Sequence, residues 1–140
     1  SGGHISQGTV KLNDTYLKTS TYNTPAWRNL VMCQEVGHTF GLDHQDENFD
    51  NPPLGTCMDY TSDPAPNQHP NAHDYEELAI IYNHLDSTTT VKGAFSTDGL
   101  EHPKTWGELV GSSRGGAQQT YVRDFGGGRL VVTQVTWALE

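Results

Sequence analysis

The sequence predicts an α+β fold in a single domain that spans residues 1–140. Three observations carry this prediction. Two segments have helical spacing with capping residues at their starts, one short segment near the N-terminus alternates with period two, and two β-rich runs flank a glycine turn near the C-terminus. A chain of 140 residues is long enough for one hydrophobic core and not for two.

The first expected element is a short strand over residues 8–16, GTVKLNDTY. Val10 and Leu12 fall on one face of this segment, whereas Thr9 and Lys11 fall on the other. Such an alternation is typical of a strand with one buried face, and the polar residues that follow predict a turn.

A helix is expected over residues 25–41. Thr24 supplies a hydroxyl that can cap its first turn, and Pro25 suits the first helical position because an N–H there has no partner within the helix. Gly41 ends the helix, since glycine adopts the left-handed conformation at little cost.

Residues 43–71 are expected to form a long loop, because they lack periodicity and are rich in Asp, Asn, Pro and Gly. Loops of this length inside a domain are usually functional or held by ions or bridges. A second helix is expected over residues 72–85, with Asn71 as its cap and Asp74 three residues further on.

The remaining residues, 86–140, are expected to be an extension that is mostly loop and ends in a β-hairpin. The runs TYVRDF and RLVVTQVTW flank three glycines, which is typical of two strands and their turn. The run TWGELV indicates a short turn of helix before them.

The stretch QEVGHTFGLDH, residues 34–44, carries the main chemical signal. Glu35, His38, Gly41 and His44 have the spacing of an extended zinc motif. His38 projects from the last turns of the helix, and Gly41 allows a sharp turn after which His44 can reach the same ion. A glutamate beside such ligands can hold and deprotonate a water molecule whose pKa zinc lowers.

A second motif, GTCMDYT, lies downstream at residues 55–61. The two motifs together resemble those of the metzincins, the zinc endopeptidase clan whose HExxHxxGxxH helix is followed by a Met-turn. The match holds at each motif position except the first, where Gln34 replaces a histidine. The run HDYEELAIIY is also similar to the C-terminal helix of the matrixins, so the resemblance covers about residues 8–86.

The resemblance implies a metzincin-like catalytic domain that depends on Zn²⁺ and hydrolyses peptide bonds in protein or peptide substrates. Its metal ligands would be Gln34, His38 and His44. Glu35 would be the catalytic base that activates water. Tyr60 would reach the zinc or the oxyanion, as the equivalent tyrosine does in astacin-like and serralysin-like members.

Met58 would be the Met-turn methionine that forms a hydrophobic floor beneath the metal. In this fold the Met-turn passes under the active-site helix, so the resemblance also implies a disulfide between Cys33 and Cys57. Such a bridge belongs to an oxidising compartment, and two buried free thiols are the alternative. The strand at residues 8–16 would line the cleft and pair with an extended substrate.

Gln34 leaves two hypotheses open. A glutamine oxygen is a neutral and harder donor than imidazole, so zinc should bind more weakly, although glutamine is long enough to ligate from the same helical position. The first hypothesis is a working secreted endopeptidase. The second is a non-catalytic descendant, a binding module with weak or absent zinc. The intact Glu35 argues against the second.

The metzincins have several strands before the active-site helix, and this chain has only a short segment there. Two explanations stay open. Either the upstream strands were cut away and the chain is truncated at its N-terminus, or the C-terminal hairpin replaces part of the sheet.

The formal charge of -9 argues against nucleic acid or an anionic membrane as partner. No apolar stretch is long enough to span a bilayer. The acidic charge fits a secreted protein, and a monomer is expected. Oxygen-rich loops also suit Ca²⁺, although no calcium-loop spacing is met and solvated acids are the alternative. The acidic residues in question are Asp43, Asp46, Glu47, Asp50, Asp59 and Asp63.

Overall fold

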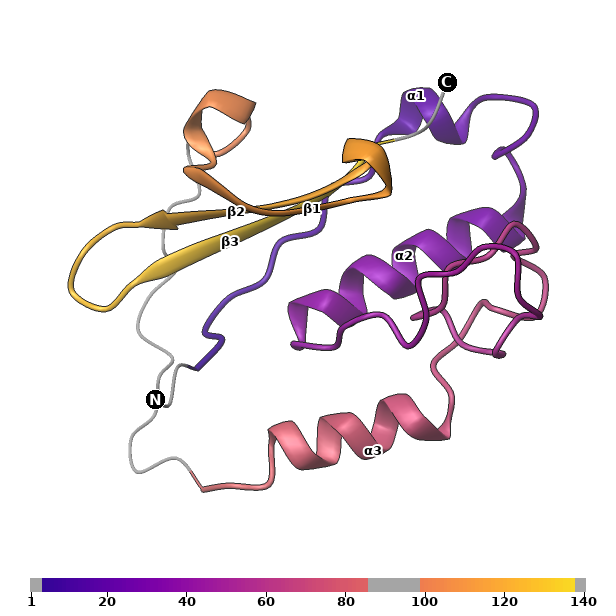
Figure 1. Ribbon diagram of the computed structural model, residues 1–140, viewed down its shortest axis with the longest axis horizontal. Coiled ribbons are helices and arrows are strands. Elements are labelled where there is room, and N and C mark those ends of the chain that lie inside the picture. The colour runs from indigo at the N-terminus through magenta and orange to yellow at the C-terminus, as the bar shows by residue number, and fades with distance from the viewer. Residues whose placement is uncertain (1–3, 86–98, 138–140) are drawn as a thin grey trace. The chain divides into compact units, whose positions relative to one another are not determined.

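The computed structural model describes residues 4–85 and 99–137. The chain divides into two compact units, Ser1–Ala94 and Phe95–Glu140, where the sequence predicts one domain. Within the described residues, three α-helices belong to the first unit and one three-stranded antiparallel sheet belongs to the second (Figure 1). This arrangement confirms the α+β class.

The strand predicted over residues 8–16 is wrong. Residues 4–13 have no regular structure, and a short helix, α1, spans Asp14–Leu17. Asn13 caps this helix by accepting a hydrogen bond from Thr15 N at 3.0 Å. A strand needs a neighbour for its backbone groups, and the segment has none among the described residues, so the local preference of Asn for a helix cap prevails.

The second helix, α2, spans Pro25–Thr39 and begins as predicted. Thr24 Oγ1 accepts a hydrogen bond from Trp27 N at 3.3 Å, which satisfies one of the free donors of the first turn. The helix ends slightly before residue 41, because Phe40 is its C-cap and Gly41 turns the chain with a φ of 91°.

The third helix, α3, spans Ala72–Ile81 and ends before the predicted residue 85. Asn71 and Asp74 form the expected capping box, in which each side chain accepts a hydrogen bond from the backbone of the other. Leu78 and Ile81 pack against the small core of this unit. That core consists of Leu42, Cys57 and Met58.

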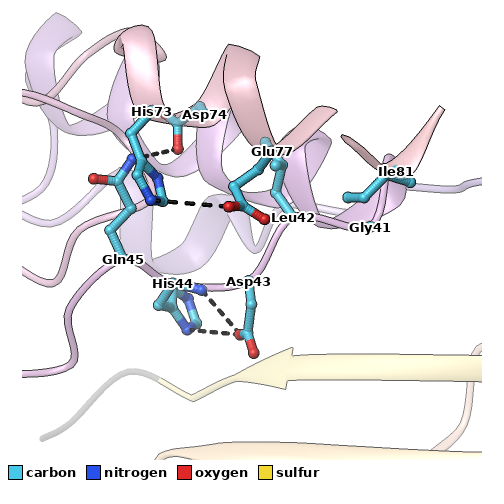
Figure 2. A pocket seen from close by; sticks show the side chains of 9 residues that line it. All are labelled: Gly41, Leu42, Asp43, His44, Gln45, His73, Asp74, Glu77 and Ile81. Carbon is cyan, nitrogen blue, oxygen red and sulfur yellow. Dashed lines mark hydrogen bonds and ion pairs between the residues drawn. The ribbon is translucent and has the colours of Figure 1, made fainter. Parts of the chain in front are cut away.

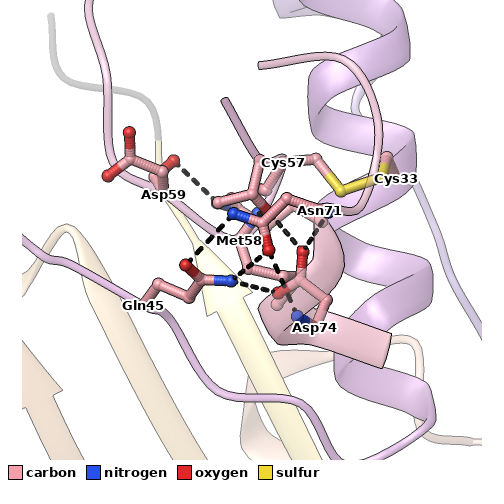
Figure 3. Close-up of a disulfide and its surroundings, with 9 residues drawn as sticks. Cys33, Gln45, Cys57, Met58, Asp59, Asn71 and Asp74 are labelled. Atoms are coloured by element: carbon pink, nitrogen blue, oxygen red, sulfur yellow. Dashed lines mark hydrogen bonds between the residues drawn. A yellow bond between two sulfur atoms is a disulfide. The ribbon is translucent and has the colours of Figure 1, made fainter. Parts of the chain in front are cut away.

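A disulfide between Cys33 and Cys57 joins α2 to the loop that follows it (Figure 3). It confirms the bridge that the resemblance implies. The two cysteines are 24 residues apart in sequence, and closing a loop of that size contributes roughly 3 kcal/mol in the loop-entropy model. The bridge therefore holds the turn at residues 56–60 against the helix.

A buried carboxylate ties the same turn to the start of α3. Asp74 exposes 1% of its surface and accepts a hydrogen bond from Thr56 Oγ1. It also accepts from Gln45 Nε2 at 2.7 Å and from Asn71 N at 2.8 Å. Figure 3 shows Gln45 and Asn71 beside this carboxylate. Burying this charge is tolerated because several donors surround it.

The second unit contains β1 (Glu108–Ser113), β2 (Gln118–Asp124) and β3 (Leu130–Thr136), in the order β1-β2-β3. The predicted hairpin is confirmed by the β2–β3 pair, which turns through three glycines with positive φ. The run TWGELV does not form a helix turn. A 3₁₀ turn, Pro103–Thr105, ends just before Trp106, and the rest of the run leads into β1, because β2 pairs with it apart from an irregularity between Leu109 and Gly111.

The fold makes a specific prediction for Gly37, which lies on α2 above Met58. A Cβ atom at residue 37 would lie 2.5 Å from Met58 Sδ, which is too close. Replacing a helical glycine by alanine ordinarily stabilises by about 0.5–1 kcal/mol. Here we expect Gly37→Ala to destabilise by about 1–3 kcal/mol through overpacking.

Urea unfolding of the two proteins measures this difference. The double variant Gly37→Ala, Met58→Val is the control, because the shorter side chain makes room for the added methyl group. An increase in stability for Gly37→Ala alone would show that the helix and the turn are not in close contact.

Candidate functional site

The motif residues of α2 lie where this helix meets the turn at residues 56–60. Gln34 is buried, with 6% of its surface exposed, whereas Glu35 and His38 are half-buried. Gln34 and His38 are one helical turn apart, so their side chains leave the helix on the same side. Glu35 is displaced by about 60° from His38 around the helix axis, beside this column and not in it.

The amide of Gln34 is held by the backbone of the turn. Its Nε2 donates to Cys57 O at 3.0 Å and to Asp59 O at 3.5 Å. The amide oxygen Oε1 is therefore the atom of this side chain that is left for a metal ion.

The glycine turn after α2 returns the chain toward His38. Gly41 N donates to His38 O at 3.0 Å, and Leu42 N donates to Gly37 O at 3.2 Å. These bonds close the helix end and direct the following residues back along it. As a result, the ring centroids of His38 and His44 are 4.6 Å apart.

The two imidazoles meet through their Nε2 atoms, which are 3.0 Å apart. The Nδ1 atom of His38 lies 2.8 Å from Leu42 O, and a proton on Nδ1 is the only one that can make this bond. The lone pair of His38 Nε2 then faces His44. Histidines that bind zinc commonly donate the N–H of their other ring nitrogen to a carbonyl oxygen, as His38 does here.

His44 is largely buried, and its environment opposes a positive charge. The pKa of His44 is lowered from 6.5 to about 4, chiefly by burial and also by the nearby His38, whereas Asp43 acts in the opposite direction. Asp43 Oδ1 and Glu47 Oε1 lie 3.8 Å and 3.9 Å from Nδ1. At neutral pH the ring is neutral, which is the form that binds metals.

Tyr60 and Met58 complete the surroundings. The Tyr60 ring is 3% exposed and its centroid lies 4.2 Å from that of His44. Met58 is fully buried beneath α2, in contact with Gly37. The turn thus brings Tyr60 to the histidine pair and Met58 to Gly37 of α2.

This donor set fits a zinc ion in part. Two nitrogens bound to one zinc at 2.0–2.1 Å with a tetrahedral angle lie about 3.3 Å apart, close to the observed 3.0 Å. Within residues 4–85 and 99–137, no group of three or more His, Cys, Asp or Glu side chains is arranged to hold a metal. A third protein ligand therefore has to be of another type, and the amide oxygen of Gln34 meets that requirement.

A pocket of about 170 Å³ lies beside His44, between the segment that follows α2 and helix α3 (Figure 2). His73 and Glu77 form an i,i+4 pair on its α3 side, with Nε2 and Oε1 4.0 Å apart. The sequence does not indicate this pocket, although the i,i+4 spacing of His73 and Glu77 on a helix is a signal for the pair. Its lining residues are Gly41, Leu42, Asp43, His44, Gln45, His73, Asp74, Glu77 and Ile81.

No protein-family model, curated protein or solved structure matches this chain. Among the described helices, none combines the length and the apolar character that crossing a bilayer requires. The disulfide is compatible with an extracellular location.

The low pKa of His44 predicts a pH dependence of stability in the chelator-treated protein. Between about pH 6.5 and pH 4 the unfolded chain binds a proton at His44 that the folded chain does not bind. Stability should therefore decrease as the pH falls through this window. His44→Asn should reduce that slope, as urea unfolding at a series of pH values would measure.

His73→Asn is the matched control, because His73 is exposed and its side chain is 58% accessible. His44→Asn should change the slope more than this control does. If the two variants changed the slope equally, His44 would not be the residue that binds the proton.

Proposed function

We propose that this chain is a secreted, zinc-dependent endopeptidase of metzincin type. The observation that supports the proposal most directly is the 3.0 Å approach of His38 Nε2 to His44 Nε2, two residues whose spacing is that of the zinc motif. The neutral state of His44 and the hydrogen bond that orients His38 favour the same conclusion.

The zinc ligands in this proposal are His38 Nε2, His44 Nε2 and Gln34 Oε1. Gln34 suits the role because its amide has two ends with different chemistry. Its Nε2 donates to Cys57 O, just as a ligand histidine donates its second ring N–H to a carbonyl, and the other end is an acceptor. Like a ligand histidine, Gln34 donates a hydrogen bond with one end of its side chain and offers a lone pair to the metal with the other. The ligand atom is oxygen in place of nitrogen.

When bound, zinc would polarise the carbonyl of the scissile peptide bond and lower the pKa of water at the site. Glu35 is the residue proposed to take the proton from that water and to pass it to the leaving amine. Tyr60 is proposed to donate a hydrogen bond to the oxyanion that develops on the carbonyl. Met58, which is fully buried, is proposed to form an apolar floor beneath the histidines.

Protein or peptide substrates, a monomeric state and secretion belong to the same proposal. The metzincin fold is proposed for the unit Ser1–Ala94. In this unit α2, the turn at residues 56–60 and α3 follow one another in the order of that clan. A substrate strand paired with residues 8–16 is not part of the proposal, because these residues do not form a strand.

A second candidate function is a non-catalytic binding module. The contacts of Gln34 favour it, because an amide that joins α2 to the turn at residues 56–60 has a structural role even without a metal. In this case the pocket beside His44 would bind a ligand and Glu35 would have no catalytic task.

Metal content and peptide hydrolysis separate the two candidates. We expect about one zinc per chain after dialysis against zinc and removal of the excess, and hydrolysis of an unstructured protein that a chelator abolishes. Glu35→Gln should retain zinc but lower kcat by roughly 10²–10⁴-fold. Gln34→His should tighten zinc binding by about tenfold or more, which corresponds to roughly 1.4 kcal/mol.

His69→Gln is the control for an exposed histidine outside the pocket and should change neither zinc content nor hydrolysis. If the unmodified chain retained zinc but hydrolysed no peptide bond, and Glu35→Gln bound zinc equally well, the binding module would be favoured. A chain that retains no zinc, and for which Gln34→His restores none, would contradict the metal site itself.

A further inference from the structure

The turn at residues 56–60 and the loop before it contain a second group of oxygen atoms, distinct from the histidine pair. Asp59 is fully buried, with 0% of its surface exposed. Its Oδ2 accepts hydrogen bonds from Leu54 N at 2.9 Å and from Asn67 Nδ2 at 2.8 Å. Its Oδ1 is also buried, and nothing in the described part of the chain donates a hydrogen bond to it. A buried carboxylate oxygen in this state requires an explanation.

A second acceptor oxygen, in the loop before the turn, is also buried without a hydrogen-bond donor among the residues that the structure describes. The Oδ1 atom of Asn51 is buried and receives no hydrogen bond from any described residue. The other end of its amide, Nδ2, donates to Asp46 Oδ2. Two acceptor oxygens therefore lack donors, and each belongs to a side chain that is otherwise well held.

The backbone brings these side chains to one place. Asp46 and Asp59 form a parallel β-bridge, and Tyr60 N donates to Asp46 O at 3.1 Å. Paired residues in such a bridge project their side chains to the same side. The segment 51–54 joins the two carboxylates, since Asn51 bonds to Asp46 and Leu54 bonds to Asp59.

The carboxylate of Asp59 points away from the disulfide and from the Gln45–Asn71–Asp74 network, as Figure 3 shows. Its free oxygen is therefore not part of that network. It lies on the side of the turn that the loop 46–54 covers, where Leu54 N contacts its partner oxygen.

The charged side chains of this region, histidines aside, are all acidic. Residues 29–91 contain no lysine or arginine. Arg28, the last basic residue before this stretch, is bound through Nη2 to Leu17 O and Asn23 Oδ1. Asp46, Asn51 and Asp59, which the bridge and the Asn51–Asp46 hydrogen bond link, thus have no basic side chain in their own segment. A water molecule could donate to both free oxygens, but it would not neutralise the charge.

We propose that Asp46, Asn51 and Asp59 form a binding site for a calcium ion. Every donor in the group is an oxygen, which is the ligand type of Ca²⁺ and not of zinc. The side-chain ligands are Asn51 Oδ1, Asp59 Oδ1 and the carboxylate of Asp46, with backbone carbonyls of the loop and water completing the coordination. Mg²⁺ is less suitable, because it demands a regular octahedron and keeps most of its water.

The ion would stabilise the turn that carries the candidate catalytic tyrosine. Asp59 directly precedes Tyr60, and its carbonyl oxygen accepts the hydrogen bond from Gln34. Calcium bound at the Asp59 side chain would restrict both. The calcium proposal does not depend on zinc, because the two proposed sites share no ligand residue.

Isothermal titration of the full chain with CaCl₂, after chelator treatment and with or without excess zinc, tests the proposal. We expect about one Ca²⁺ per chain, with a dissociation constant on the order of 10⁻⁴–10⁻³ M, as in extracellular calcium modules. Calcium should also raise Tm. Asp59→Asn should weaken binding by roughly tenfold or more, because ligand charge sets calcium affinity.

Asp63→Asn is the matched control, because it removes the same charge from an exposed residue of the same loop and should leave calcium binding unchanged. Asn51→Asp is the second variant and adds a carboxylate to the site, so it should tighten binding even if Asp59→Asn folds poorly. The absence of calcium binding in the unmodified chain would overturn the proposal and leave a buried water as the partner of both oxygens. Equal losses in Asp59→Asn and Asp63→Asn would overturn it as well. Neither result would bear on zinc content or on hydrolysis.

Discussion

The attachment of α2 to the turn at residues 56–60 is the constraint on which the rest of the first unit depends. It is made in three ways within one helical turn: by the disulfide from Cys33, by the amide of Gln34 and by the contact of Gly37 with Met58. An isolated helix of this length is marginal in water, and the buried hydrophobic cluster beneath it is small. Covalent and polar contacts therefore supplement a modest hydrophobic core, as is common in small domains.

The same turn separates two chemical environments. On one side lie the imidazoles of His38 and His44 with the ring of Tyr60, a nitrogen-rich group that suits zinc. On the other side lie the oxygen atoms around Asp59, which suit a harder cation. Asp59 belongs to both, because its carbonyl contacts Gln34 and its carboxylate faces the loop. An ion bound on either side would restrict the same short segment of backbone.

Gln34 is the residue at which the sequence and the structure inform one another most. In the sequence it is a departure from a zinc motif, and its meaning is open. In the structure its nitrogen bonds to the turn, in the position where a ligand histidine would direct its second ring nitrogen. Gln34 thus links the helix to the turn through its nitrogen and leaves its oxygen for the proposed metal ion. The proposed weak but specific zinc site follows from that exchange of nitrogen for oxygen.

Local interactions were predicted well from the sequence. The helix starts at Thr24–Pro25 and at Asn71 depend on hydrogen bonds that span only three residues, and the hairpin depends on a glycine turn between two adjacent strands. The motif spacing of His38 and His44 was visible for the same reason, because Gly41 lies between them and alone reverses the chain.

Features that depend on distant partners were decided only by the tertiary structure. The segment 8–16 has the alternation of a strand but no neighbour to pair with among the described residues, whereas β1 became a strand because β2 lies beside it. The low pKa of His44 comes from its burial, and the two unsatisfied oxygens of Asn51 and Asp59 come from a bridge between residues 46 and 59. The sequence by itself determined the caps, the turn and the order of the motifs, since these need only neighbouring residues. Burial, strand pairing and the meeting of charges were decided by the folded chain, since they depend on which remote segments come into contact.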